Sequence, residues 1–280
     1  MVSINSNYAA NFAAKAARQT TTELNSAMEK LSTGKRINYA RDDAAGQAIA
    51  VRLTAEIQGL AVAARNAADA QSLIDTAEGA LQESTSLLLR MRELAVQSSN
   101  STNSDADRAA LQTEAASLEA EISRIANTTT WGGKNLLDGS FSGDTSVAGR
   151  TFQIGTTSGE TIELSIPEMT ATAATIGYSV ALSIGSFTGA QSAIGAIDAA
   201  LSGVSEVRGK MGAASNRLNS TIGNLNQIRV NLMASKGRIM DTDFAAETGN
   251  LAKGQILQQA ATAMLAQANA SKQSVLVLLQ

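Results

Sequence analysis

The sequence contains no cysteine and no histidine among its 280 residues. These absences exclude thiolate nucleophiles, disulfides, imidazole general bases and nearly all zinc sites. The chemistry open to the chain is therefore limited to carboxylates, amines, guanidinium groups, hydroxyls and thioethers.

Aromatic residues make up only 3% of the chain, and Pro167 is its single proline. A compact core depends on large side chains, because each Phe or Trp buries several times the area of an Ala. Much of the 44% apolar fraction is alanine, the best helix former. The composition therefore predicts long helices that pack closely along their length.

Net charge and long apolar runs are also lacking. With a formal charge of −3, the chain lacks the excess of Lys and Arg that is typical of nucleic-acid-binding proteins. No stretch approaches the roughly 18 apolar residues of a membrane span, and residues 1–8 lack the features of a signal peptide. We therefore expect a soluble protein that binds no nucleic acid, inserts into no membrane and is exported by a route without a signal peptide.

Several fragments resemble pieces of active sites without completing them. The Gly-Lys pair at 34–35 lacks the upstream glycine and following hydroxyl of a phosphate-binding loop. Nothing marks a pocket around the carboxylate pairs Asp42–Asp43 and Asp241–Asp243 that would suit them to acid–base chemistry, and the second pair also lacks the glycine and glutamate of a calcium loop. Helix capping and surface solvation are the better interpretation. Trp131 is expected to pack its glycine-flanked turn over helix ends. We expect no enzyme, no cofactor and no metal.

What the sequence does contain is two long heptad repeats, over residues 53–95 and 197–239. In the first, large side chains alternate with small ones, which favours close packing against another helix. The repeated positions are Leu53, Leu60, Ala67, Ile74, Leu81, Leu88 and Ala95, then Ile197, Val204, Met211, Leu218, Leu225, Leu232 and Ile239. A further helix, capped by Ser104 or Asp105, is predicted after the first repeat.

A period of two appears at Thr151–Ile166, where Phe152 and Ile154 precede a turn-rich stretch and a second alternating run. This pattern predicts one small β-hairpin. Residues 167–189 are rich in Gly, Ser and Thr and are expected to form a short irregular insert.

Both ends of the chain are predicted to be amphipathic helices, and the C-terminal one finishes on five apolar residues at 275–279. In a chain that runs out and returns antiparallel, these ends lie side by side. The predicted fold is mainly α: a long antiparallel helical rod or coiled coil with paired N- and C-terminal helices and one small β-hairpin.

Four blocks resemble the signatures of bacterial flagellin. They are LSTGKRINYARDDAAGQAI at 31–49, RELAVQSSNSTN at 92–103, ILQQAATAMLAQAN at 256–269 and LVLLQ at 276–280. With the hairpin, the resemblance covers nearly the whole chain in order. The chain is identified as a member of this family, in a short form with almost no outer variable domain.

The resemblance implies a structural subunit that polymerises helically into the extracellular flagellar filament used for swimming. It implies an inner coiled-coil domain of 1–40 with 241–280, an outer-core domain of 41–166 with 190–240, and a variable insert at 167–189. Implied partners are further copies of the chain in an open helical polymer, the type III flagellar export apparatus and its chaperone, the filament cap and hook-junction proteins, and a host Toll-type receptor.

The matching positions imply three sets of contact residues. The inner-tube contacts are Ile4, Tyr8, Phe12, Leu257, Met264, Leu265, Val275, Leu276, Leu278 and Leu279. The signature contacts are Arg36, Asn38, Arg41, Asp42 and Asp43. The receptor contacts are Arg90, Glu93, Leu94, Gln97 and Glu114.

Two alternatives share this scaffold: a hook–filament junction protein and a flagellin-like surface binding protein. The intact ARDDAAGQ and ILQQA blocks favour flagellin, and the second alternative needs a central domain for which the chain has little room. Burying Val275–Leu279 contributes about 8–15 kcal/mol in gross terms, which ordering costs of about 1–2 kcal/mol per residue largely offset. We therefore expect termini that order on assembly, and filament growth that stops when 275–280 are deleted.

Overall fold

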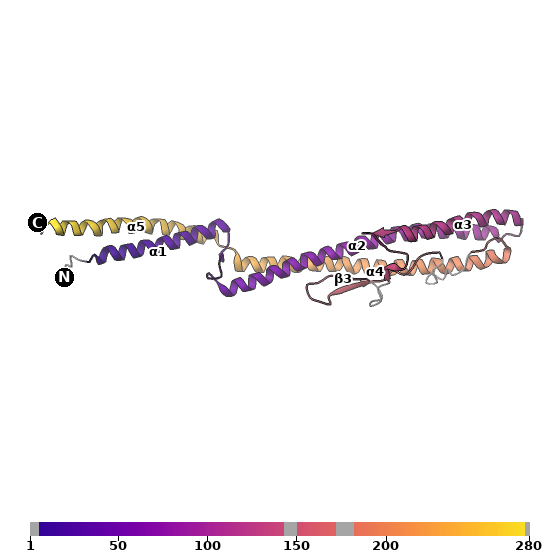
Figure 1. Ribbon diagram of the computed structural model, residues 1–280, viewed down its shortest axis with the longest axis horizontal. Helices are drawn as coiled ribbons and strands as arrows, with labels where there is room; N and C mark the ends of the chain where they lie inside the picture. The colour runs from indigo at the N-terminus through magenta and orange to yellow at the C-terminus, as the bar shows by residue number, and fades with distance from the viewer. Residues whose placement is uncertain (1–5, 143–149, 172–181, 278–280) are drawn as a thin grey trace. The chain divides into compact units, whose positions relative to one another are not determined.

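The computed structural model describes residues 6–142, 150–171 and 182–277. These residues form a mainly α fold, as predicted, with five helices and two short antiparallel hairpins (Figure 1). The helices are α1 (Tyr8–Thr33), α2 (Ala44–Ser98), α3 (Asp105–Thr128), α4 (Phe187–Met240) and α5 (Phe244–Val277). The strands are β1 (Thr130–Trp131), β2 (Lys134–Asn135), β3 (Arg150–Gln153) and β4 (Thr161–Leu164), and a 3-10 turn, η1, spans Ser140–Ser142.

The chain divides into two compact units. The terminal unit consists of Met1–Ile57 and Val230–Gln280, and the central unit of Gln58–Arg229. No helix in the described ranges is long and apolar enough to cross a membrane.

Antiparallel helices build the central unit. Polar contacts between α2 and α4 show the direction, because Nε2 of Gln71 donates to Oγ of Ser215 at 2.7 Å while Nε of Arg92 donates to Oδ1 of Asp198 at 2.7 Å. The heptad positions from Ala67 to Ala95 and from Ile197 to Leu218 fill one apolar core, including Leu81, Ile197 and Met211, each at most 1% exposed.

The predicted hairpin is present as β3–β4, with Arg150 opposite Leu164 and Gln153 opposite Thr161. Ile162 and Leu164 are buried on its inner face, as the alternation requires. The side-chain amide of Asn66 donates to the carbonyl of Gln153 at 3.0 Å, which ties the hairpin to α2.

The expectation of a single hairpin is wrong, because β1 and β2 form a second one. Thr130 pairs with Asn135 and Trp131 with Lys134, around a two-residue loop of Gly132 and Gly133 with φ of 56° and 78°. This loop geometry needs positive φ at both positions, which glycine supplies without strain. Two-residue strands are too short to show an alternating pattern in the sequence.

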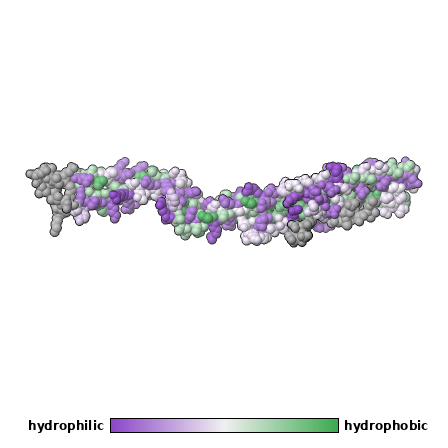
Figure 2. Space-filling model, in the orientation of Figure 1, coloured by the Kyte–Doolittle hydropathy of each residue, from purple (hydrophilic) through white to green (hydrophobic). Residues whose placement is uncertain are grey.

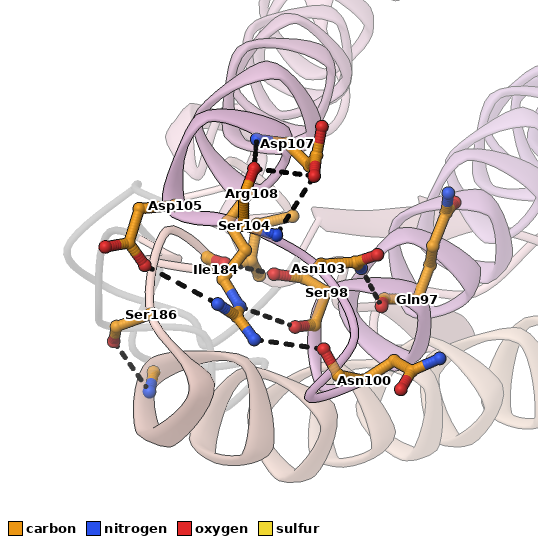
Figure 3. A network of polar contacts seen from close by, with 11 residues as sticks. Gln97, Ser98, Asn100, Asn103, Ser104, Asp105, Asp107, Arg108, Ile184 and Ser186 are labelled. Carbon is orange, nitrogen blue, oxygen red and sulfur yellow. Dashed lines mark hydrogen bonds and ion pairs between the residues drawn. The ribbon is translucent and has the colours of Figure 1, made fainter.

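The corner between α2 and α3 is held by a network of polar contacts (Figure 3). The buried Arg108 guanidinium donates to the carbonyls of Ser98 and Asn100, at 3.0 and 2.9 Å. Ser104 caps α3, which confirms one of the two predicted alternatives, Ser104 or Asp105. It also forms a capping box with Asp107. The Ser104 hydroxyl and backbone N–H lower the pKa of the Asp107 carboxyl.

The same corner fixes the segment that leads into α4. The Ser98 hydroxyl donates to the carbonyl of Ile184, and the amide of Gln112 both donates to the carbonyl of Leu182 and accepts from the N–H of Ile184. Ile184 is 1% exposed. Part of the expected irregular insert is therefore core, while its residues 172–181 lie outside the described ranges.

Candidate subunit interface

The helices α1 and α5 of the terminal unit lie side by side in antiparallel orientation (Figure 1). The side-chain amide of Asn7 donates to the carbonyl of Ala268 at 3.1 Å, and Nζ of Lys30 lies 3.7 Å from Oε1 of Glu247. Asn7 also caps α1, and Gly34 ends it in the left-handed conformation with φ of 68°. The predicted pairing of the terminal helices is confirmed.

Small residues make the contact between these two helices. The buried positions recur every seven residues and are Ala13, Thr20 and Ala27 on α1 and Gly254, Ala261 and Ala268 on α5. At Gly254, an added Cβ would lie 3.5 Å from Cβ of Leu24, so the backbones approach closely there. Small side chains permit this approach but bury little apolar area.

Large apolar side chains stand on the outside of the pair, in contrast to the amphipathic arrangement that the spacing favours. Tyr8 is 77% exposed, Phe12 76%, Met264 64% and Leu257 42%. On the face that Figure 2 draws, green apolar residues are interspersed with purple polar ones along the terminal helices. Phe12, Leu257 and Met264 line a groove of about 430 Å³ with Ala9, Ala16, Thr20, Ala260, Gln267 and others.

The structure therefore brings three of the expected inner-tube residues to one groove, with Tyr8 exposed on the same helix as Phe12. Leu265 is partly buried beside the seam. The remaining calls lie outside the described residues or side chains; they are Ile4, Val275, Leu276, Leu278 and Leu279.

The signature residues after α1 bind their own chain. Arg36 donates from its backbone N–H to the carbonyl of Met240 at 2.6 Å and from Nη2 to that of Ile239 at 2.8 Å. Oδ1 of Asp43 accepts from the N–H of Gly46 at 2.8 Å at the start of α2. Through the two hydrogen bonds of Arg36, this loop binds the end of α4, next to the α4–α5 junction of the terminal unit.

Asp42 shapes the same loop by accepting hydrogen bonds from the N–H groups of Tyr39 and Asn38, at 2.9 and 3.1 Å. These bonds stabilise the carboxylate and lower the pKa of Asp42. The Asn38 side chain donates to the carbonyl of Lys35 at 3.2 Å. The Arg41 side chain also contacts its own chain, with Nε 3.9 Å from Oδ1 of Asp42 and the guanidinium 4.6 Å from the centroid of the Tyr39 ring, but it is 78% exposed.

The expected receptor residues gather on the surface of α2 and α3, with one exception. Arg90 forms ion pairs with Glu93 and Glu114, both at 2.9 Å, and Glu114 followed by Glu93 raises the pKa of Arg90. Gln97 is exposed nearby, but Leu94 is 1% exposed and packs in the central core. Receptor recognition by this surface stays a prediction, and the side chain of Leu94 cannot reach a receptor while the core is intact.

Similarity to known proteins shows the family to which this chain belongs. The chain matches the bacterial flagellin N-terminal helical region over residues 4–142 and the bacterial flagellin C-terminal helical region over 194–279. A flagellin of Halalkalibacterium halodurans is 50% identical over 254 residues, which cover 91% of each chain. This chain belongs to the bacterial flagellin family. It is a subunit of the flagellar filament, which lies outside the cell.

Two further proteins are similar to this flagellin. The flagellar filament 31.3 kDa core protein of Treponema maltophilum is 43% identical over 260 residues, or 90% of this chain and 91% of its own. A solved structure described as a flagellar hook-associated protein of Vibrio parahaemolyticus has a TM-score of 0.59, covering 71% of this chain and 100% of its own. At 20% identity this second likeness shows a shared fold alone. The relatives therefore favour the filament subunit over a hook-junction protein.

The residues expected at the inner tube do not include those buried between α1 and α5. The motif resemblance selected large apolar side chains, whereas Ala, Thr and Gly occupy the buried positions of the contact. A seven-residue repeat of small residues, such as Gly254, Ala261 and Ala268, is the signal that identifies it.

Proposed function

We propose that this flagellin polymerises through the groove of the α1–α5 pair, which a second copy of the chain covers. The observation that carries the proposal is the exposure of Phe12 and Met264 on a helix pair whose own contact is made by small residues. Covering each large side chain contributes about 1.5–3 kcal/mol. A contact between different surfaces of identical subunits continues without closing, which produces an open helix.

The groove also supplies a reason for ordering on assembly. Two helices joined mainly through Ala, Thr and Gly bury little area, and isolated helix pairs of this kind are marginal in water. Neighbouring copies add the missing apolar contacts. We expect α1 and α5 to exchange amide protons rapidly in dilute subunit and slowly in the filament.

The same proposal assigns roles to the rest of the chain. Residues 1–40 with 241–280 form the inner domain that lines the filament channel, and 41–166 with 190–240 form the outer core. The exposed Arg41 guanidinium is the signature group available to a neighbouring subunit, while Arg36, Asp42 and Asp43 hold the loop that presents it.

Export by the flagellar type III apparatus with a chaperone, and contacts with the filament cap and hook-junction proteins, belong to this proposal through the family. The role is structural and not enzymatic. Recognition by a Toll-type receptor is proposed for disassembled subunit through Arg90, Glu93, Gln97 and Glu114, because these side chains are exposed together.

Two matched substitutions test the assembly proposal. Phe12→Ser removes an aromatic side chain of the groove, whereas Phe187→Ser removes one that is 44% exposed in the central unit. We expect Phe12→Ser to raise the critical concentration for seeded filament growth at least about tenfold, as an interaction of 1.4 kcal/mol requires. Phe187→Ser should grow normally by electron microscopy and sedimentation. Normal growth of the Phe12→Ser protein would exclude the groove as the subunit contact.

A further inference from the structure

Thioethers are the only sulfur groups of this chain, because it contains eight methionines and no cysteine. Four of the methionines are at most 9% exposed, and they are Met91, Met169, Met211 and Met240. Three others are exposed: Met264 at 64%, Met233 at 49% and Met28 at 48%. Among the seven methionines within the described residues, an oxidant that reaches the folded subunit therefore meets these three sulfur atoms first.

Of the three methionines that the described residues show as exposed, only Met264 belongs to the lining of the α1–α5 groove described above. It shares that lining with Phe12 and Leu257. Met28 lies on α1 but outside the groove lining, and Met233 lies on α4. Within the described residues, Met264 is thus the exposed methionine of the groove, and Met28 and Met233 are two exposed internal controls.

We propose that Met264 is a redox modification site at which a peroxide converts the thioether to a sulfoxide in the unassembled subunit and thereby blocks filament growth. The inference rests on the proposed role of the groove. A sulfur lone pair attacks one peroxide oxygen, the O–O bond breaks, and an S–O bond forms. With hydrogen peroxide, water is released. Sulfur loses two electrons and the peroxide gains them.

The groove offers little to satisfy a sulfoxide oxygen. Nearby lining residues include Ala9, Ala16 and Ala260, which carry no polar side-chain atoms. The hydroxyl of Thr20 already donates to the carbonyl of Ala16 at 2.9 Å, and that of Ser271 donates to Ala268 at 3.0 Å.

The amide of Gln267 is the remaining polar side chain of the lining. Covering the sulfoxide with a second copy would bury a strong dipole in a largely apolar contact. Once the groove is covered, the sulfur is shielded from peroxide. Oxidation therefore distinguishes free subunit from filament.

The test oxidises full-length unassembled subunit with hydrogen peroxide until mass spectrometry shows sulfoxide at the exposed methionines. We expect the oxidised protein to show a critical concentration for seeded growth about 10- to 100-fold above that of untreated protein. Met264→Leu keeps an apolar side chain without an oxidisable sulfur, so its critical concentration should be the same before and after this treatment, whatever its untreated value. Met28→Leu and Met233→Leu should lose assembly on oxidation as the parent protein does.

Several outcomes would overturn the inference, two of them in the oxidation experiment itself. In one, Met264→Leu loses assembly on oxidation as fully as the parent protein. In the other, rescue comes from Met28→Leu or Met233→Leu. Reduction by methionine sulfoxide reductases should restore growth of the oxidised parent, and persistent loss after complete reduction would also contradict the inference.

A polar substitution separates this inference from the assembly proposal. Met264→Gln, a polar side chain of similar length, should raise the critical concentration, while Met233→Gln should leave it unchanged. If Phe12→Ser blocks growth but Met264→Gln does not, the redox inference fails and the groove remains the contact. If the Phe12→Ser and Met264→Gln proteins both grow normally, the assembly proposal itself fails.

Discussion

The central unit buries large apolar side chains as well as small ones, whereas the contact between α1 and α5 of the terminal unit buries mainly small ones. In the central unit, Leu81, Phe141 and Ile197 are at most 1% exposed. In the terminal unit, Ala27 is 2% exposed while Phe12 is 76% exposed. A unit that buries its large side chains is stable by its own contacts, whereas one that exposes them leaves most of its apolar area for other copies. Under the assembly proposal, this difference assigns folding mainly to the central unit and assembly mainly to the α1–α5 pair.

The largest expected effect compares two phenylalanines. Phe141→Ala empties a fully buried site in the central unit and should lower the free energy of unfolding by about 3–5 kcal/mol. Phe12→Ala should change it by less than about 0.5 kcal/mol in unassembled subunit, because the ring is mostly in water. Urea unfolding followed by circular dichroism measures both. Equal losses would mean that the two units are stabilised alike.

The next effect concerns Arg108 at the α2–α3 corner. Arg108→Ala leaves the carbonyls of Ser98 and Asn100 without these donors and should cost about 1–3 kcal/mol in the same unfolding experiment. Arg124→Ala on the same helix is the control, since its exposed ion pair with Glu121 is worth at most about 1 kcal/mol. A smaller loss for Arg108→Ala than for the control would contradict the role of the buried guanidinium.

A stabilising change is expected in the terminal unit. Gly254→Ala adds a Cβ at 3.5 Å from Leu24, an ordinary contact, and should stabilise α5 by up to about 1 kcal/mol through helix propensity. Gly254→Leu overfills the seam and should destabilise the pair. Amide hydrogen exchange within α1 and α5 reports both effects. Slower exchange in the leucine variant than in the parent would show that the helices do not need this close approach.

The smallest effect depends on pH and compares one carboxylate in each unit. Hydrogen bonds lower the pKa values of Asp107 and Asp42 below the ordinary value of 3.8. Each carboxylate therefore contributes stability that is present above that value and is lost as pH falls through the lowered pKa. Asp107→Asn should make the stability of the α3 start less dependent on pH, and Asp42→Asn should do the same for the 36–43 loop. The affected range is roughly pH 5 to 2, in which carboxyl groups titrate.

Hydrogen exchange at α3 and at the loop, measured across that range, tests the prediction. The contacts of both carboxylates are local, so both units should respond. An unchanged acid dependence in either variant would show that its carboxylate is not linked to folding there.

Much of the fold could be predicted from local patterns. The heptads place Leu81 and Met211 in helices and in a core, Ser104 marks the start of α3, and alternation from Phe152 onward marks a hairpin. These signals work because capping and periodicity depend on neighbours in sequence. Two features were not predicted: the β1–β2 hairpin and the hydrogen bonds of Gln112 with residues 182 and 184. Each depends on contacts that no short sequence pattern encodes.

The candidate interface was predicted only in part. Motif resemblance selected Phe12 and Met264, which the structure places in one groove, but it also selected Leu94, which the structure buries. A motif identifies which residues recur together and does not say which way each side chain points. Whether a side chain is buried depends on contacts between segments that are distant in the sequence.

The amino-acid sequence by itself determined the type and order of the helices, the exclusion of thiol and imidazole chemistry, and the flagellin motifs. Tertiary structure alone decided which apolar residues face inward. Phe12 and Ala13 are adjacent and both apolar, yet the alanine is buried and the phenylalanine is exposed. The physical reason is that closely packed helix axes admit only small side chains between them, so the large ones must turn outward.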